Sequence, residues 1–378
     1  MDLGGLGDLI GTIYNYILPF LFVLTVVVFF HELGHFLVAR WCGVAVDSFS
    51  VGFGRELFGY NDRHGTRWKM CWIPLGGYVK FRGDENAASM PDRDVELSQA
   101  ERAGSFHEKP LASRAAIVAA GPIANFILAI VIFAVMFTVV GRPMLSPIVD
   151  EVAAESAAAE AGFVAGDLVT SIDGTDIASF SELQRIVSQS ADQPLAVVVE
   201  RGGALVTLNA TPRLQEISGA FGNKMRVGVL GIRRAASPDA VKVVKTDPIT
   251  SVGLGVKETW NVITTTMSYL GKVVSGSESA DQLGGPIRIA QISGQAASLG
   301  FLALINLAAV LSVSIGLINL FPVPMLDGGH LVYYGIEALR GQPLSAESQD
   351  LGFRIGMGLV LMLMLFATWN DLVHLQVL

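Results

Sequence analysis

The chain has 378 residues, of which 51% are hydrophobic and only 16% are charged. Soluble domains usually carry about a quarter charged residues, so most of this chain is not an ordinary soluble core. The mean hydropathy of +0.51 points the same way. The formal net charge of −8 argues against a nucleic-acid-binding protein, because binding phosphates requires a positive surface.

Four uncharged runs predict transmembrane helices. The first covers residues 9–30 and, as a helix, is long enough to cross a hydrocarbon core of about 30 Å. The others cover residues 115–140, 289–326 and 355–370. The third run is longer than one crossing needs, so we expect its first part to lie at the membrane interface. The sequence therefore predicts a polytopic α-helical membrane protein with about four spans.

The distribution of Lys and Arg predicts the topology. Residues 39–114, between the first two runs, are rich in both, whereas residues 1–30 and the tail after Asn370 have none. The positive-inside rule then places this loop in the cytoplasm and both termini outside. Cys42 and Cys71 fall in the loop, where a reducing compartment keeps such thiols unpaired.

Residues 144–232, between the second and third runs, have the character of a soluble module. Strand-like segments cover residues 168–172, 195–200 and 205–209. A short helix fits residues 181–188, where Ser181 and Gln184 match a capping box. The pattern predicts a small α+β domain, which the topology places outside the membrane.

Residues 256–274 carry apolar side chains at helical spacing on one face, with charged residues such as Lys257 and Lys272 elsewhere. The spacing predicts an amphipathic helix. It leaves open whether the apolar face packs against the rest of the protein or lies on the outer membrane surface.

The sequence HELGH at residues 31–35 ends the first apolar run. On a helix, His31 and His35 differ by about 40° around the axis, so both imidazoles face one point. Glu32 lies beside them and can reach a metal-bound water without being a ligand. The alternative is a polar helix end at the interface. Ionisable residues at membrane depth each cost about 2.5–3.5 kcal/mol, however, which favours a buried zinc site with three protein ligands.

Asp327 is the candidate third ligand, because it ends the third uncharged run and has the same cost of burial. Pro322 and Pro324 break the helix before it, which a membrane tolerates only where protein or a cavity satisfies the backbone. The alternative for Asp327 is a helix N-cap at the interface. His330 fits a supporting role better than a ligand role, and Asn319 either forms a structural hydrogen bond or contacts substrate.

Three motifs together resemble the site-2 protease family, and in particular its bacterial branch, the regulator-of-sigma-E proteases. They are HELGH at 31–35, GPIANF at 121–126 and NLFPVPMLDGG at 319–329. The likeness runs nearly end to end, through GGPI at 284–287 and RIG at 354–356. Each motif alone has limited specificity, whereas the combination is highly specific.

The resemblance implies a zinc metalloendopeptidase with Zn²⁺ as its cofactor. It implies that His31 and His35 are zinc ligands, that Asp327 is the third ligand and that Glu32 is the general base. The same three ligands are the candidates that the buried polar residues indicate without the resemblance.

The resemblance also implies two substrate-binding elements. Asn319 would contact the substrate or stabilise an oxyanion. Residues 50–54 would form a β-like hairpin that re-enters the membrane beside the zinc, where Gly52, Phe53 and Gly54 would bind an extended substrate strand. Without the resemblance, the sequence predicts only a cytoplasmic hairpin here.

The external module resembles a bacterial PDZ domain. The likeness rests on AGFVAGDL at 161–168 and SIDG at 171–174. The best-known relatives carry two PDZ domains in tandem, whereas residues 141 to about 250 have room for one. A model in which two such domains filter substrates together therefore does not carry over to this chain.

The expected fold is thus a polytopic membrane protein with an inserted α+β PDZ domain and a β-hairpin-like re-entrant loop. Its predicted parts are a first span with HExxH (1–40), the loop region (41–113), a second span (114–141), the PDZ domain (142–235), an amphipathic helical linker (236–299), a third span with the Asp motif (300–330), and a loop with the fourth span (331–378).

The resemblance implies cleavage of peptide bonds in or near the transmembrane segment of single-span proteins such as anti-sigma factors, in the bacterial inner membrane. The expected partners are those substrates and the lipid bilayer, with no nucleic acid. Another membrane zinc peptidase would usually take its third ligand from a downstream Glu motif, which we do not find. The non-enzyme alternative is a PDZ-bearing membrane scaffold with a vestigial metal site, and a transporter fits least because no internal repeat is visible.

Overall fold

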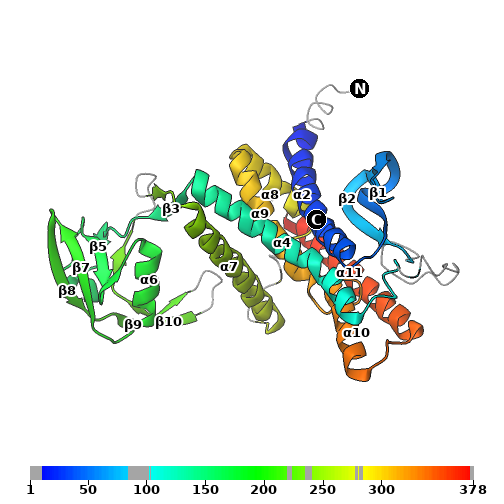
Figure 1. Ribbon diagram of the computed structural model, residues 1–378. Coiled ribbons are helices and arrows are strands. Elements are labelled where there is room, and N and C mark those ends of the chain that lie inside the picture. The colour runs from blue at the N-terminus through cyan, green and yellow to red at the C-terminus, as the bar shows by residue number, and fades with distance from the viewer. Residues whose placement is uncertain are drawn as a thin grey trace. The chain divides into compact units, whose positions relative to one another are not determined.

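The computed structural model describes residues 11–83, 102, 104–218, 224–234, 241–276, 280 and 284–374. Part of the predicted 41–113 loop region, residues 84–101 and 103, lies outside this set. The chain divides into two compact units, which are described separately: Met1–Ala134 with Val252–Leu378, and Val135–Ser251. Figure 1 shows the helices and strands of both units.

Four helices among the described residues are long and apolar enough to cross a membrane. They are the helix Ile13–Trp41, which joins a short π-helical turn (Ile13–Ile17) to α2 (Leu18–Trp41), together with α4 (Leu111–Val139), α9 (Phe301–Asn319) and the segment Glu347–Val373 of α11 (Ala346–His374). The four predicted spans are confirmed by length and composition.

The long third run is not one helix. It forms α8 (Pro286–Ser298) and α9, separated at Gly300, whose φ of +116° favours glycine. The expectation that only part of this run crosses the membrane therefore agrees with the helix boundaries. The predicted part 300–330 is also divided, because α9 ends at Asn319 and a new helix, α10 (Asp327–Arg340), begins at the candidate ligand. The two prolines between these helices prevent a continuous helix.

The predicted amphipathic helix lies within α7 (Pro248–Val274). A Cβ placed on Gly255 would come within 2.7 Å of the backbone oxygen of Ile130 in α4. Part of α7 therefore packs closely against α4, which favours the first of the two alternatives for residues 256–274.

The loop region contains two long strands, β1 (Val46–Asn61) and β2 (Arg67–Phe81), which bend back on themselves. Residues 48–51 of β1 are paired on one side with residues 77–80 of β2 and on the other side with residues 67–70. Residues 67–70 also pair with residues 58–61, so the result is a curled sheet with residues 77–80 as one outer row, called the outer row below, and residues 58–61 at the opposite edge. Its core includes Phe49 and Trp68, whose rings stack with 4.3 Å between their centroids.

The bend in β1 depends on glycine. Gly52 has a φ of +86°, which other residues rarely adopt, and a Cβ there would lie 2.7 Å from the backbone oxygen of Ile73. Phe53, the next residue, stacks on Tyr78 with 6.0 Å between ring centroids. The predicted hairpin is therefore present, with residues 52–54 at its bend.

The second unit is built on a four-stranded antiparallel sheet in the order β6-β5-β7-β8. Its strands are β5 (Leu168–Ile172), β6 (Thr175–Asp176), β7 (Leu195–Arg201) and β8 (Ala204–Ala210). They confirm the three predicted strands. Shorter elements complete the unit: β3 (Arg142–Leu145) with β12 (Val241–Val244), β4 (Glu151–Val152) with β11 (Ile232–Arg233), β9 (Arg213–Ser218) with β10 (Lys224–Val229), and α5 (Ala157–Glu160).

The predicted short helix of this unit is α6 (Phe180–Gln189), and its capping differs from the prediction. The side chain of Ser179 accepts a hydrogen bond from the Glu182 amide, and the Glu182 carboxylate accepts one from the Ala178 amide. Ser179 is therefore the N-cap, and the proposed capping box of Ser181 and Gln184 was wrong, because the helix begins one residue earlier than expected.

Candidate metal centre

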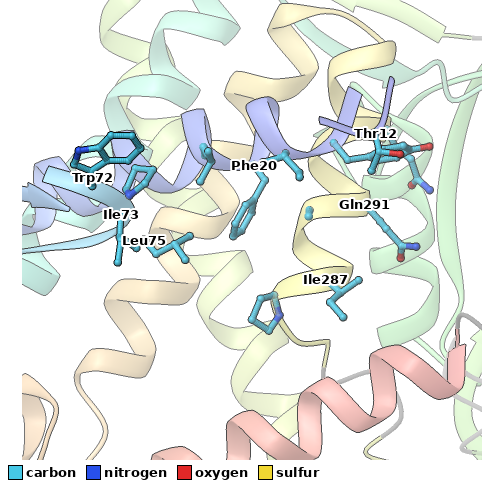
Figure 2. Close-up of a pocket in the computed structure, with 14 residues that line it drawn as sticks. Thr12, Phe20, Trp72, Ile73, Leu75, Ile287 and Gln291 are labelled. Atoms are coloured by element: carbon cyan, nitrogen blue, oxygen red, sulfur yellow. The ribbon is translucent and has the colours of Figure 1, made fainter. Parts of the chain in front are cut away.

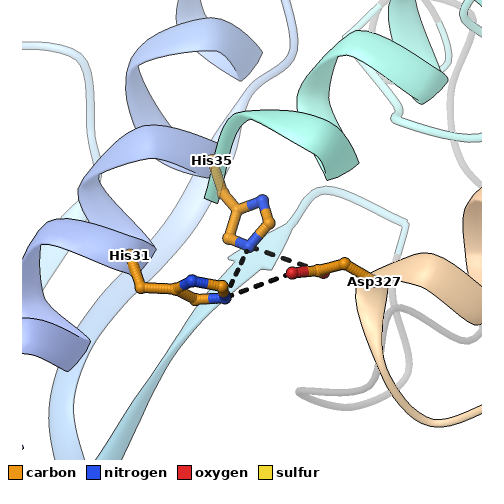
Figure 3. Close-up of side chains that lie close together, drawn as sticks. All are labelled: His31, His35 and Asp327. Atoms are coloured by element: carbon orange, nitrogen blue, oxygen red, sulfur yellow. Dashed lines mark hydrogen bonds and ion pairs between the residues drawn. The ribbon is translucent and has the colours of Figure 1, made fainter. Parts of the chain in front are cut away.

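The two histidines of HELGH lie on one face of α2 and point to a common place (Figure 3). Nε2 of His31 and Nε2 of His35 are 3.3 Å apart, and both residues are almost fully buried. This is the arrangement that the i, i+4 spacing predicts.

Asp327 completes the cluster from the first position of α10. Its Oδ2 lies 3.2 Å from Nε2 of His31, and its Oδ1 lies 3.6 Å from Nε2 of His35. One ligand atom from each of these three side chains lies within 4.8 Å of the other two. The structure therefore brings together the three residues that the sequence proposes as ligands, although Asp327 is far from the histidines in the chain.

The spacing of these atoms fits zinc. Ligands about 2.0–2.2 Å from a tetrahedral zinc are about 3.3–3.6 Å apart. The two Nε2 atoms are 3.3 Å apart, and the two carboxylate oxygens lie 3.2 Å from Nε2 of His31 (Oδ2) and 3.6 Å from Nε2 of His35 (Oδ1). Oδ2 of Asp327 is buried and accepts no hydrogen bond, which leaves it available as a ligand. Two imidazoles and one carboxylate are also a donor set that catalytic zinc sites use, with the fourth position open.

The backbone of α4 orients His35. Nδ1 of His35 lies 2.9 Å from the backbone oxygen of Ile117. Because a carbonyl can only accept, Nδ1 carries the proton and Nε2 keeps its lone pair for a metal.

Gly121 makes room for both imidazoles. A Cβ at this position would collide with Nε2 of His35 and would lie 2.9 Å from Cε1 of His31. Gly34 plays the matching part on α2, because a Cβ there would collide with the backbone oxygen of Ala120. Glycines at the crossing of α2 and α4 thus permit the close approach that places the histidines against α4.

Glu32 lies outside the three-residue cluster and next to β2. A Cβ on Gly77 would be 3.2 Å from Cγ of Glu32, so Gly77 leaves space for this side chain. The Glu32 carboxylate accepts a hydrogen bond from the backbone amide of Val79. The candidate base therefore sits between the histidines and the outer row of the curled sheet.

The other predicted site residues are not part of the cluster. Nδ2 of Asn319 donates to the backbone oxygen of Ile315 in its own helix, at 3.0 Å. Residues 52–54 occupy the bend of β1, as described above. Glu337, a second carboxylate on α10, is not near the cluster's metal-facing atoms but forms a bidentate ion pair with Arg114. The roles of Asn319 and of residues 52–54 in binding substrate stay predictions.

An apolar pocket of about 880 Å³ lies between α2, β2 and α8 (Figure 2). Its walls include Phe20 of α2, Trp72 and Leu75 of β2, and Ile287 of α8. Leu75 is two residues from Gly77, which adjoins Glu32, so the strand that passes the candidate base continues into the pocket wall.

Sequence reasoning alone missed the parts played by Ile117, Gly121 and Asn125. Asn125 is fully buried on α4, and its Nδ2 lies 3.3 Å from Nδ1 of His31. The sequence contained one signal for these roles: the GPIANF motif places small and polar residues inside an otherwise apolar span. We assigned no function to the residues of this motif.

Comparison with known proteins agrees with this geometry. Residues 19–363 match the model of peptidase family M50. A Rhizobium meliloti protein with "zinc metalloprotease" in its name is 53% identical over 361 residues, which cover 95% of this chain and 96% of the relative. An Agrobacterium fabrum protein named in the same way is 52% identical and covers 96% of this chain and 97% of the relative. Metalloprotease MmpA of Caulobacter vibrioides is 43% identical over 376 residues, 93% of this chain and 94% of the relative.

The family match covers most of the chain, including the three candidate ligand residues, the whole of α4 and α9, and most of the other two apolar helices. It confirms the resemblance inferred from the motifs, and zinc is the cofactor that the family uses. The chain is a multi-pass membrane protein that belongs to peptidase family M50, the site-2 protease family.

Proposed function

We propose that this zinc metalloprotease hydrolyses peptide bonds inside the membrane, with His31, His35 and Asp327 as the zinc ligands. The observation that carries the proposal is the position of the histidines. Both belong to a helix, Ile13–Trp41, that is long and apolar enough to span a bilayer. A metal centre on such a helix meets peptide bonds that soluble proteases cannot reach.

Glu32 would act as the general base and later as the general acid. When bound, zinc polarises the scissile carbonyl and makes water more acidic. Glu32 takes a proton from the attacking water and passes it to the leaving nitrogen, which such a group can accelerate by about 10²–10⁴-fold. Its location beside the three ligands, without membership in the cluster, supports this division of roles.

The substrate would bind as an extended strand. Residues 77–80 form the outer row of the curled sheet, and the Glu32 carboxylate lies at Gly77 and Val79. An extended peptide added along this row would have its backbone beside the base, as in β-augmentation. The predicted residues Gly52, Phe53 and Gly54 would support this row from the bend, since Phe53 stacks on Tyr78.

The apolar pocket would accept apolar side chains of the same substrate, because Leu75 in its wall lies two residues before the first residue of the outer row. Asn319 would contact the substrate or stabilise the oxyanion. A peptide rich in apolar residues is typical of a transmembrane segment. We therefore propose that the substrates are single-span membrane proteins, such as an anti-sigma factor.

We further propose that the second unit is a PDZ domain on the periplasmic side and that the protein resides in the bacterial inner membrane with both termini periplasmic. The small antiparallel sheet with α6, together with the motifs at 161–168 and 171–174, supports the PDZ proposal. The abundance of Lys and Arg in residues 39–114 supports the orientation.

The test combines a zinc measurement with cleavage of a panel of single-span proteins by the full-length enzyme and by Glu32→Gln. We expect stoichiometric zinc in both and cleavage by the wild type alone. Equal cleavage by the two proteins would show that the protease activity does not come from this site. Zinc without cleavage of any single-span protein would favour the scaffold alternative.

A further inference from the structure

Asn125 is the most deeply buried polar side chain in contact with a candidate zinc ligand. It has no exposed surface, and its Nδ2 lies 3.3 Å from Nδ1 of His31. Its Oδ1 is buried and has no hydrogen-bond partner. A buried carbonyl without a partner is costly, so its arrangement in a native protein requires an explanation.

The position of the proton on the His31 ring determines which way the Asn125 amide must point. Nε2 of His31 faces His35 and Asp327, so it must keep its lone pair to bind a metal. A neutral imidazole with a lone pair on Nε2 carries its proton on Nδ1. Nδ1 then needs an acceptor, and the NH₂ group of an amide cannot accept.

A half-turn of the Asn125 amide exchanges its oxygen and nitrogen without changing its shape. Oδ1 then lies where it can accept the proton of His31 Nδ1, and the NH₂ group takes the buried position that Oδ1 left. His35 has the same arrangement already, since its Nδ1 lies 2.9 Å from the backbone oxygen of Ile117. Each histidine would then donate to one acceptor on α4.

The Asn125 backbone is held in place by α9. Oγ of Ser312 donates to the backbone oxygen of Asn125 at 2.8 Å, and Ser312 is itself fully buried. A Cβ on Gly316 would lie 3.1 Å from Cβ of Asn125, so the two helices are in close contact at this point. Close packing of the two helices, in addition to this hydrogen bond, fixes the backbone from which the amide reaches His31.

We propose that Asn125 is a positioning residue for the metal centre, whose side-chain carbonyl accepts the Nδ1 proton of His31 and so fixes the tautomer and orientation of this ligand. The proposal rests on the assignment of His31 as a zinc ligand. Loss of zinc in His31→Ala tests that assignment separately, so the two ideas fail in different ways.

Three full-length variants test the proposal. Asn125→Leu has a similar size and no acceptor, and we expect its zinc affinity to fall by about 10–100-fold, as for other residues that support metal ligands. Asn125→Asp keeps an acceptor and cannot donate, so its affinity should stay within about threefold of the wild type or increase. Ser312→Ala is the matched control, because it removes the bond to the Asn125 backbone and leaves the amide in place.

The measurements are zinc affinity, by competition with a chelator, and the visible spectrum of the Co²⁺-substituted protein, which reports the ligand geometry without reference to cleavage. We expect an altered Co²⁺ spectrum for Asn125→Leu and spectra like the wild type for Asn125→Asp and Ser312→Ala. Asn125→Leu with unchanged zinc affinity overturns the proposal. If Asn125→Leu does not fold, Asn125→Asp decides. A loss of zinc affinity of tenfold or more in folded Asn125→Asp would show that the Asn125 amide donates to Nδ1 of His31, and this result would also overturn the proposal.

Discussion

Arg114 and Glu337 form a bidentate ion pair that joins the first turn of α4 to α10. Nη1 of Arg114 lies 3.2 Å from Oε2 of Glu337, and each side chain has only 15% of its surface exposed. The guanidinium also lies 5.1 Å from the ring centre of Tyr334. Glu337 and Asp327 both belong to α10. The ion pair therefore fixes α10, which carries the third candidate ligand, to α4, which contacts both histidines.

The first prediction concerns this pair. Glu337→Gln should lower the free energy of unfolding by about 1–3 kcal/mol, because it leaves the charge of Arg114 without its partner in a largely buried place. It should also weaken zinc binding measurably, since α10 loses its tie to α4. Thermal unfolding of the zinc-loaded and zinc-depleted protein measures both effects.

The exposed ion pair between Arg354 and Asp350 is the control. Asp350→Asn should change the free energy of unfolding by less than about 0.5 kcal/mol, because exposed pairs contribute little. Equal effects of Glu337→Gln and Asp350→Asn would mean that burial of the Arg114–Glu337 pair has no structural importance.

The second prediction separates the base from the ligands. Glu32→Gln keeps the size of the side chain and loses its basicity, so zinc should remain near stoichiometric while cleavage falls at least about a hundredfold. His31→Ala, His35→Ala and Asp327→Ala should each lose zinc, because two protein ligands remain.

Asp327→Asn is the sharpest of these variants, since a neutral amide of nearly equal size is a poor zinc ligand. Metal analysis of the purified protein is the measurement. If Asp327→Asn binds zinc and cleaves like the wild type, Asp327 is not the third ligand. His330 would then be the next candidate, because Glu337 is already paired with Arg114.

The third prediction concerns the space that Gly121 provides. Gly121→Ala should abolish stoichiometric zinc binding, because the added methyl group would displace the imidazole of His35 and press on that of His31. Gly358→Ala in α11 is the matched control, since a Cβ there meets no atom within 4 Å. Zinc bound equally by both variants would show that α4 can move away from α2 without harm to the centre.

The spans, the ligand candidates and the strands of the second unit could be predicted because each depends on a local pattern. Uncharged length identifies a span, and the i, i+4 spacing of His31 and His35 places them on one face of a helix. The burial argument for Asp327 needs only its position at the end of an apolar run. None of these inferences requires knowledge of which helices are neighbours.

The roles of Gly121 and Asn125 depend on that knowledge. The helix α4 is apolar all round, so no periodicity in its sequence marks the side that faces α2. The bends of β1 and β2 could not be predicted for a similar reason. Residues 48–51 pair with residues 67–70 on one side and with residues 77–80 on the other, and a simple hairpin would form only one of these pairings.

The fourth prediction tests the proposed topology by thiol labelling. The native thiols are poor probes: Cys71 is 2% exposed and its Sγ lies 3.3 Å from Oγ of Ser50, and Cys42 is only partly exposed. We therefore expect better labels on introduced cysteines at exposed positions. In a background without native cysteines, Thr175→Cys should react with a membrane-impermeant reagent in intact spheroplasts, and His64→Cys should react only after the membrane is opened. Labelling of His64→Cys from outside would reverse the proposed orientation.

The fifth prediction concerns pH and the second unit. Asp167 is fully buried, and its carboxylate accepts hydrogen bonds from Nε and Nη2 of Arg201, each at 2.7 Å, and from the Val164 amide at 3.0 Å. The hydrogen bonds from Arg201 are the main reason that the pKa of Asp167 lies below its usual value, with the Val164 amide acting in the same direction and burial opposing them.

A carboxyl group whose pKa is lower in the folded than in the unfolded state stabilises the fold at pH values above the unfolded pKa, which is about 3.9 for Asp. This stabilisation declines as the pH falls below that value and is lost once the folded protein is protonated as well.

Wild-type stability of the second unit should therefore decline below about pH 4. Asp167→Asn should be less stable at pH 7 and should show a weaker decline with acid. Hydrogen exchange of the β5 and β7 amides in the full chain, followed from pH 7 to pH 3, measures both curves after correction for intrinsic exchange rates. Parallel curves would mean that Asp167 does not link the stability of this unit to pH.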